Sequence, residues 1–258
     1  MKISIITASW NSENSIADTQ RSLAMQDYPR DQIEWIVVDG ASTDRTIERI
    51  KAGSFQPDKF VSEQDSGIYD ALNKGVRMAT GDVVGFLHAD DFFASPEALN
   101  RISCAFEYAG TNAVYADLQY VRPLATGEFG VVRHWKSGDF CREKLQWGWM
   151  PPHPTLYLKR EVYEQVQLAC GEYFDTSFSC AADYDFMMRI FGTYGVEPAY
   201  LPMVLVKMRI GGVSNRSFRH IVAKSREDWC AIRRNSVGHI HTLIWKNVGK
   251  LNQFIPRR

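Results

Sequence analysis

The sequence lacks the features of a membrane-spanning or secreted protein. It holds no apolar run of about 18 to 20 residues, the length that a helix needs to cross a bilayer. Its first ten residues, MKISIITASW, contain an apolar run too short for the core of a signal peptide. We therefore expect a cytoplasmic protein, either free or peripheral on the cytoplasmic face of the inner membrane.

Cysteine is scarce and its spacing is irregular. The chain has five cysteines, an odd number, and no C-x-x-C pair. Such a distribution predicts neither a disulfide framework nor a zinc site. Reduced cysteines in structural positions are therefore expected.

Net charge is absent overall, because 30 Lys and Arg balance 30 Asp and Glu. The two signs are nevertheless separated along the chain. Residues 207–258 carry 12 basic and 2 acidic side chains, which leaves 18 basic and 28 acidic ones in residues 1–206. A basic end on an acidic body predicts an anionic partner for that end, and we do not expect this partner to be nucleic acid.

Apolar strands and amphipathic helices alternate in the first 110 residues. Strands are expected at 3–6, 33–38, 59–61 and 83–87, and helices at 15–26, 44–52, 68–79 and 96–108. Later strands are expected at 114–121 and 131–135, and later helices at 161–169 and 183–194. This alternation is typical of a mainly parallel sheet with helices on both faces.

Polar and acidic groups stand where the first four strands end. They are Thr7, Ala8 and Ser9, then Asp39, then Asp65, then Asp90 and Asp91. Because ligands bind at the carboxyl ends of parallel strands, these groups are expected to form one anionic rim. The two adjacent carboxylates at the fourth strand suit Mg²⁺ or Mn²⁺, and a solvated turn is the alternative interpretation.

Two acids begin the helix expected at 183–194. Asp183 or Asp185 is a candidate general base, and the alternative is that both only complement the helix dipole. Lys74, in the helix at 68–79, is a candidate contact to phosphate.

Aromatic residues and prolines crowd the segment from 147 to 154. Trp147 and Trp149 are candidate platforms for a sugar ring, and His153 is a candidate contact to the acceptor or a metal. Core packing and a rigid structural loop are the alternatives.

Five stretches together resemble family 2 glycosyltransferases of the GT-A fold, especially bacterial enzymes of exopolysaccharide and O-antigen assembly. They are SIITASWNS, VVDGASTDRT, DSGIYDALNKG, FLHADD and AADYDF, in the family's order and spacing. The resemblance implies an α/β, Rossmann-like, mixed and mainly parallel sheet over residues 1–215. The nucleotide-binding half would be 1–110, the acceptor-binding half 111–215, and residues 216–258 a basic helical extension.

The resemblance also implies a role for each matching residue. The nucleotide and donor sugar would be bound by Thr7, Ala8, Ser9, Asp39, Asp65, Asn73, Lys74 and Asp90. Asp91 would be the direct ligand of Mn²⁺ or Mg²⁺, and Asp183 the catalytic base. Trp147, Trp149, His153 and Asp185 are expected near the acceptor.

Three positions depart from the family's pattern. Ala182 stands where the family has Glu before the base, and His88 stands where Asn or Asp is common. Residues 209–215, RIGGVSN, lack the His that some members use as a further metal ligand.

The implied reaction moves a sugar from a UDP- or GDP-linked donor to a hydroxyl of a glycan or lipid-linked acceptor, with inversion at the anomeric carbon. A metal-dependent nucleotidyl- or phosphotransferase is one alternative, although the loop 7–14 has no basic residue or glycine to grip phosphate. A non-catalytic nucleotide-sugar-binding protein is the other, suggested by Ala182.

The last twenty residues have the pattern of a basic amphipathic helix. Its apolar positions are Ile240, Leu243, Ile244, Val248, Leu251, Phe254 and Ile255. Such a helix is typical of a contact with an anionic membrane surface, and packing on protein is the alternative.

Overall fold

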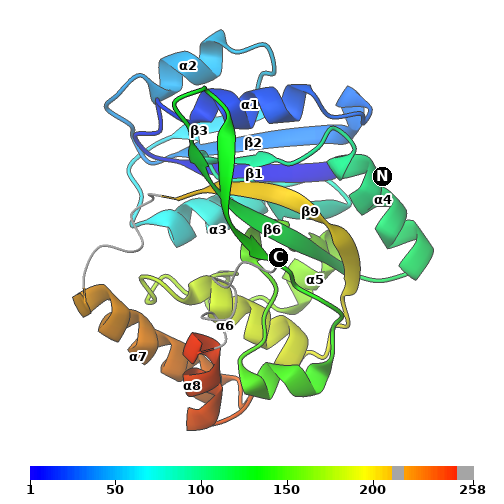
Figure 1. Ribbon diagram of the computed structural model, residues 1–258, viewed down its shortest axis with the longest axis vertical. Helices are drawn as coiled ribbons and strands as arrows, with labels where there is room; N and C mark the ends of the chain where they lie inside the picture. The colour runs from blue at the N-terminus through cyan, green and yellow to red at the C-terminus, as the bar shows by residue number, and fades with distance from the viewer. Residues whose placement is uncertain (211–217, 249–258) are drawn as a thin grey trace.

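The computed structural model describes residues 1–210 and 218–248, and its helices lie on both faces of one sheet (Figure 1). The strands are β1 (Ile3–Ser9), β2 (Ile33–Asp39), β3 (Lys59–Ser62), β4 (Val83–Phe86), β5 (Asp91–Phe93), β6 (Ala113–Pro123), β7 (Phe129–Trp135), β8 (Tyr157–Lys159) and β9 (Ala199–Arg209). The α-helices are α1 (Ile16–Ala24), α2 (Thr46–Ala52), α3 (Ile68–Met78), α4 (Ala98–Ala109), α5 (Arg160–Gln165), α6 (Ala182–Met188), α7 (Phe218–Arg234) and α8 (Ile240–Val248). The short turns η1 (Arg30–Gln32), η2 (Arg142–Trp147) and η3 (His153–Thr155) are 3-10 helices, and η4 (Arg189–Thr193) is a π-helix.

The strand order is β3-β2-β1-β4-β8-β6-β9-β5, and β7 pairs with β6. The first four strands pair in parallel, as β1 with β2, β1 with β4, and β2 with β3. Antiparallel pairing begins at β8, which lies between β4 and β6. The predicted mixed, mainly parallel α/β sheet is therefore confirmed.

Three strands, β5, β8 and β9, were not expected from the sequence. β5 and β8 are three residues long, and each is held by pairing with a partner distant in the chain. β9 has eleven residues, eight of them apolar, with Pro202 inside the apolar run, and most of its side chains are half-buried. The helix expected at 183–194 ends at Met188 and continues as η4.

The core has two halves, one on each face of the sheet. On β1, Ile5 belongs to one half and its neighbour Ile6 to the other, because alternate side chains of a strand point to opposite faces. Helices α1, α2 and α4 cover the face of Ile5, and α3, α5 and α6 cover the face of Ile6. The described part of the C-terminal extension joins the second half through Ala231 and Ile232 of α7.

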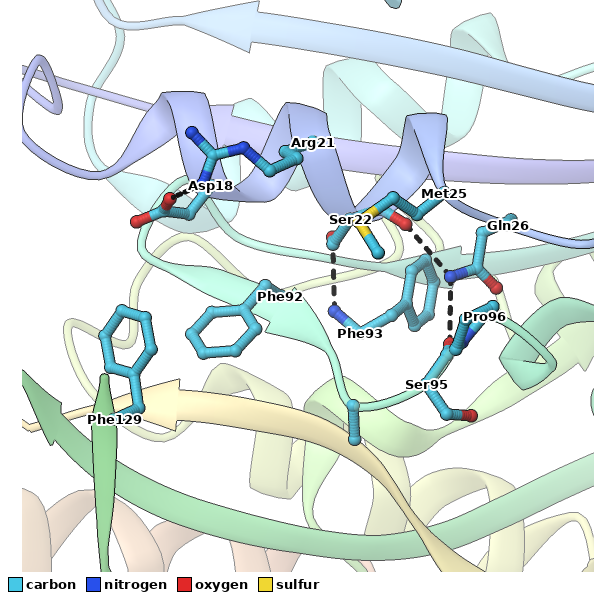
Figure 2. A pocket seen from close by; sticks show the side chains of 11 residues that line it. Asp18, Arg21, Ser22, Met25, Gln26, Phe92, Phe93, Ser95, Pro96 and Phe129 are labelled. Carbon is cyan, nitrogen blue, oxygen red and sulfur yellow. Dashed lines mark hydrogen bonds and ion pairs between the residues drawn. The ribbon is translucent and has the colours of Figure 1, made fainter. Parts of the chain in front are cut away.

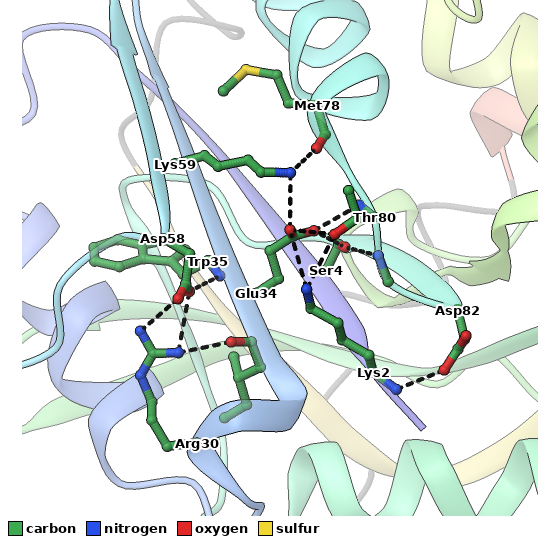
Figure 3. A network of polar contacts seen from close by, with 12 residues as sticks. Lys2, Ser4, Arg30, Glu34, Trp35, Asp58, Lys59, Met78, Thr80 and Asp82 are labelled. Atoms are coloured by element: carbon green, nitrogen blue, oxygen red, sulfur yellow. Dashed lines mark hydrogen bonds and ion pairs between the residues drawn. The ribbon is translucent and has the colours of Figure 1, made fainter.

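A polar network fixes the sheet edge opposite the carboxyl ends of the parallel strands (Figure 3). Glu34 on β2 is buried and accepts hydrogen bonds from the Ser4 hydroxyl at 2.6 Å and the Thr80 hydroxyl at 2.6 Å. The Lys59 ammonium lies 3.0 Å from the same carboxylate. Burial raises the pKa of Glu34, but these bonds outweigh it and lower the pKa to about 2. The network therefore stabilises the sheet while it stays ionised.

Across the two described ranges, no helix is both long and apolar enough to cross a bilayer. The predicted positions Leu251, Phe254 and Ile255 and the departure at 211–215 lie outside these ranges.

Candidate functional site

A hollow of about 490 Å³ opens at the carboxyl ends of β1, β2 and β3. It is lined by Trp10, Gly40, Ala41, Gln64, Asp65 and Gly67. Gly40 leaves room for the Asp65 side chain, because a Cβ at this position would lie 2.8 Å from Asp65 Oδ2 and would displace it. The hollow is of a size to admit part of a nucleotide, and Asp65 is the predicted site residue that faces it.

Asp39 organises the rim beside this hollow. The carboxylate is fully buried and accepts hydrogen bonds from the hydroxyls of Ser9 at 3.0 Å, Ser42 at 2.5 Å and Ser62 at 2.7 Å. The Ser42 backbone N–H donates a fourth bond at 2.9 Å. Asp39 and its serine donors therefore join the ends of β1, β2 and β3. A nucleobase that donates a hydrogen bond to Asp39 would bind a carboxylate oxygen that already accepts one from a serine.

Thr7 is an internal link. Its side chain is fully buried, its hydroxyl donates to the Leu87 carbonyl at 2.7 Å, and it accepts from the Trp35 indole N–H at 2.9 Å. Ala8, the next residue, is half-buried and packs against the core. The structure thus gives the Thr7 side chain a role in joining β1, β2 and β4.

Two predicted donor-binding residues of α3 make contacts within the protein. The Asn73 side chain is fully buried and makes three hydrogen bonds to the backbone of Tyr173 and Phe174, at 2.8 to 2.9 Å. Lys74 forms ion pairs with Glu63 at 2.9 Å and Asp70 at 3.3 Å. Asn73 therefore positions the segment before α6, and Lys74 is anchored at the rim.

The two adjacent acids after β4 differ in exposure. Asp90 is half-buried, whereas Asp91 has no exposed surface. Neither carboxylate oxygen of Asp91 has a hydrogen-bond partner among the described residues. Burial and the neighbouring charge of Asp90 hold the pKa of Asp91 well above its usual range, against the effect of Arg209. Asp90 is thus the acid of the pair that solvent reaches.

Arg209 is the last residue of β9, the strand that pairs with β5. Its guanidinium pairs with Asp18 of α1 and lies 4.7 Å from the ring centroid of Phe129. A hollow of about 220 Å³ beside it runs between α1 and β5 (Figure 2). No predicted site residue lines this hollow, so it is separate from the candidate site.

Asp183 is held by a residue far away in the sequence. It begins α6, it is half-buried, and its Oδ1 accepts a hydrogen bond from the Tyr69 hydroxyl of α3 at 3.1 Å. The Tyr69 ring stacks on Phe174 with centroids 6.1 Å apart. Burial and the charge of Asp183 raise the pKa of Tyr69, so the phenol stays protonated and acts as the donor.

Two histidines lie beside this acid. The rings of His88, after β4, and His153, in η3, have centroids 6.4 Å apart. Burial lowers the pKa of His88 and lowers that of His153 to about 4, and the charge of Asp183 opposes both shifts. His88 Nδ1 and His153 Nε2 are buried without a hydrogen-bond partner within the described ranges. Both rings are therefore neutral near pH 7 and keep a nitrogen for a ligand.

Asp185 points away from this cluster. It is fully buried, and its Oδ1 accepts a hydrogen bond from the Asn235 side chain of α7 at 2.9 Å. Burial raises its pKa, although Arg189 and Asn235 oppose the rise. The structure thus separates Asp183, which faces α3, from Asp185, which faces α7.

The two tryptophans also separate. Trp149 packs edge-on against Tyr115 and Phe140, and its indole N–H donates to the Ser137 carbonyl at 2.9 Å. Trp147 lies on η2 and contacts the side chains of α8. Trp149 is therefore a core residue, as the alternative to a sugar-binding role supposed. Trp147 instead forms part of the surface beside α8.

Two tyrosines near the acids were missed from the sequence. Tyr69 stands inside the stretch DSGIYDALNKG, in which the resemblance gives a role to Asp65, Asn73 and Lys74 but none to Tyr69. Tyr120 on β6 is half-buried, and burial raises its pKa with further contributions from Asp91 and Asp183. Nothing in the sequence around Tyr120 marks it, because only the sheet brings β6 to this place.

The acids after β4 fit a divalent cation that is shared with a substrate. No set of three His, Cys, Asp or Glu side chains in residues 1–210 and 218–248 is arranged to hold a metal alone. Mg²⁺ is commonly bound through one or two carboxylates together with substrate phosphates. The half-buried Asp90 and the unpartnered oxygens of Asp91 match that pattern.

Comparisons with known proteins agree with this arrangement. The model of Glycosyl transferase family 2 matches residues 4–177. An uncharacterized glycosyltransferase of Mycobacterium tuberculosis is 28% identical over 214 residues, which are 83% of this chain and 77% of that relative. A PGL/p-HBAD biosynthesis glycosyltransferase of Mycobacterium bovis is 29% identical over 189 residues, 70% of this chain and 68% of that relative.

Solved structures share the fold. S. aureus TarS has a TM-score of 0.69 at 20% identity over 98% of this chain, which spans only 43% of that chain. TarS 1-349 in complex with UDP-GlcNAc has a TM-score of 0.66 at 18% identity, over 92% of this chain and 66% of that chain. The mannosyltransferase PcManGT from Pyrobaculum calidifontis, in complex with GDP-Man and Mn²⁺, has a TM-score of 0.62 at 20% identity, over 96% and 68%.

The family model covers more than half of the chain, and both curated relatives are glycosyltransferases. The fold as a whole matches that of S. aureus TarS over 98% of this chain. The chain therefore belongs to glycosyl transferase family 2, has the GT-A fold, and is a glycosyltransferase.

Proposed function

We propose that this glycosyltransferase is an inverting enzyme that transfers a sugar from a UDP- or GDP-linked donor to a hydroxyl of a glycan or lipid-linked acceptor. The observation that carries the proposal is the Tyr69–Asp183 pair beside His88 and Asp90, next to the hollow at Asp65. Structures of the same fold hold UDP-GlcNAc or GDP-Man, which supports a nucleotide-sugar donor.

Asp183 is proposed to act as the general base. Tyr69 holds one of its oxygens, so the other oxygen takes the proton of the acceptor hydroxyl. The acceptor oxygen forms a bond to the anomeric carbon while the bond from that carbon to the diphosphate breaks. The nucleoside diphosphate leaves from the opposite face, which inverts the configuration.

The neutral histidines are proposed to orient the reacting sugars. His88 Nδ1 and His153 Nε2 are buried without a partner within the described ranges, both rings feel the charge of Asp183, and hydroxyl groups of a sugar can satisfy these nitrogens. The neutral rings leave the proton of the acceptor to the carboxylate of Asp183. In this proposal His153 contacts the acceptor or the donor sugar.

We propose that Asp90 meets a divalent cation, Mn²⁺ or Mg²⁺, with the buried Asp91 behind it. The cation supplies charge neutralisation for the leaving diphosphate when it is bound. This assignment differs from the expected one, in which Asp91 is the direct ligand, and it follows from the exposure of Asp90. The Mn²⁺ in PcManGT supports a divalent cation.

The acceptor is proposed to belong to the cell envelope. A relative of M. bovis acts in PGL/p-HBAD biosynthesis, which supports a lipid-linked or cell-surface acceptor. Such acceptors are carried at a membrane, so the proposed location is the cytoplasmic face of the inner membrane.

A binding and turnover series tests these assignments. We expect UDP or GDP to bind the wild type more tightly with Mn²⁺ than without it in calorimetry. Asp90→Asn should remove that difference, because the exposed carboxylate is lost. Asp183→Asn should keep nucleotide binding and lose sugar transfer by about 10²- to 10⁴-fold, the usual contribution of a general base.

Asp185→Asn is the matched control, since it changes the same side chain two residues away on the far face of α6. If Asp183→Asn keeps full turnover, the base assignment is wrong. Nucleotide binding that ignores both Mn²⁺ and Asp90→Asn would contradict the cation site.

A further inference from the structure

Large apolar side chains are exposed on the outer face of α8 and the neighbouring η2. Ile240, Ile244 and Trp245 of α8 are 56%, 55% and 50% exposed, and Trp147 of η2 is 53% exposed. The Trp147 ring has its centroid 6.3 Å from that of Trp245 and 5.2 Å from that of His241. We name Trp147, Ile240, Ile244 and Trp245 the aromatic patch.

The inner face of α8 packs on the protein through Leu243, Thr242 and Lys246. Leu243 packs against the core, and Thr242 is fully buried, with its hydroxyl donating to the Gln146 carbonyl at 2.5 Å. Lys246 Nζ lies 2.6 Å from Asp228 Oδ1 and 3.1 Å from the ring centroid of Tyr184. The inner face is therefore occupied, and yet Ile and Trp side chains remain on the outer face, where a helix that faces water carries polar ones. The outer face of α8 therefore has the composition of a surface that is covered in use.

The helical pair that carries the patch is basic. Residues 218–248 contain six Lys and Arg and two Asp and Glu. Both acids, Glu227 and Asp228, are engaged within the protein by hydrogen bonds or ion pairs. Arg226 and Arg233 are exposed on α7. A partner that covers the patch therefore meets a positive field as well as apolar rings.

We propose that the aromatic patch docks on an anionic phospholipid bilayer. Trp is favoured at the boundary between head groups and acyl chains, and nearby basic side chains are attracted to anionic head groups. A second copy of this chain fits less well. In a two-fold dimer the patch would meet itself, and the basic side chains of both α7 helices would be brought together.

Docking through α8 brings the helix of the candidate base near the bilayer. Lys246 of α8 covers Tyr184, which is next to Asp183 on α6. The helix that carries the proposed base is therefore one layer away from the docking surface. This step rests on the proposed function, because it assumes a lipid-linked acceptor, whereas vesicle binding itself requires no turnover.

Vesicle co-sedimentation of the full chain tests the proposal. We expect the wild type to sediment with vesicles of phosphatidylcholine and phosphatidylglycerol, and less with phosphatidylcholine alone or at high salt. The double variant Ile244→Ser and Trp245→Ser should bind about tenfold or more weakly, since two apolar side chains leave the bilayer. Tyr108→Ser is the control, because Tyr108 is 95% exposed but lies on α4.

Calorimetric nucleotide binding by the double variant checks that it is folded. Vesicle binding that is equal in the double variant and the wild type would overturn the proposal, and so would a wild type that binds no vesicles. A wild-type dimer in gel filtration that the double variant converts to a monomer would assign the patch to a second copy instead. An inactive enzyme with patch-dependent vesicle binding would overturn the proposed function and leave the docking surface standing.

Discussion

Removing the Tyr69 hydroxyl tests how Asp183 is prepared for its proposed role. The hydroxyl donates to Asp183 Oδ1 at 3.1 Å, and it joins α3 to α6 across 114 residues of sequence. Tyr69→Phe keeps the ring and its stacking on Phe174, so it deletes one hydrogen bond and little packing. Ala182, the residue before Asp183, has no carboxylate that could help to orient the base. Among the described residues, the Tyr69 hydroxyl is the group that binds the Asp183 side chain.

The expected size follows from the type of hydrogen bond. A bond to a charged group contributes about 1.5 to 3 kcal/mol, and about 1.4 kcal/mol corresponds to a tenfold change in rate. Loss of the bond, and of the orientation that it gives Asp183, should therefore lower kcat by about ten- to a hundredfold.

The assay is kcat at pH 7, measured with the donor that the calorimetric series identifies. Tyr163→Phe is the matched control, because Tyr163 is a buried tyrosine of the same core half. Its hydroxyl has no hydrogen-bond partner within the part of the chain that the structure describes. We expect the control to keep the wild-type kcat.

A kcat that is unchanged in Tyr69→Phe would refute the reasoning. Equal losses of kcat in Tyr69→Phe and Tyr163→Phe would also refute it, because they would point to a general effect of core tyrosines. A loss of nucleotide binding in Tyr69→Phe alone would place Tyr69 in the donor pocket instead.

Two further predictions concern stability, measured by urea unfolding. Glu34 has a pKa lowered to about 2 in the folded chain, so its stabilisation is present above the usual pKa of Glu and is lost as pH falls toward 2. Glu34→Gln should therefore lower the free energy of unfolding by up to about 3 kcal/mol at pH 7, and this difference from the wild type should disappear near pH 2. A difference that is independent of pH would contradict the linkage. Asn73→Ala should lower the free energy of unfolding by about 3 kcal/mol, because it leaves buried backbone groups of the segment before α6 unpaired. The control Asn100→Ala, on the surface of α4, should change it by less than about 0.5 kcal/mol. Equal effects of these two Asn substitutions would show that the buried bonds do not stabilise the chain.

The sequence alone determined the parallel half of the sheet and the family. Near-continuous apolar strands of four to seven residues are visible as such, since strands buried on both faces need apolar side chains at every position. Parallel strands end at one edge of the sheet, so the prediction that Asp39, Asp65 and Asp90 share one rim needed no coordinates. The short strands β5 and β8 were not predicted, because they form by pairing with strands that are distant in the sequence and their own residues show no strand pattern.

Tertiary structure decided which member of each candidate pair faces the site. Asp183 and Asp185 are alike in sequence, but a step of two residues turns a helix by about 200°, so one faces Tyr69 and the other faces Asn235. Asp90 and Asp91 also differ in exposure, because Asp90 lies in the turn before β5 whereas Asp91 is the first residue of that strand and is packed within the sheet. Local sequence fixes which chemical groups are present, whereas their neighbours come from segments a hundred residues away and are fixed only by packing.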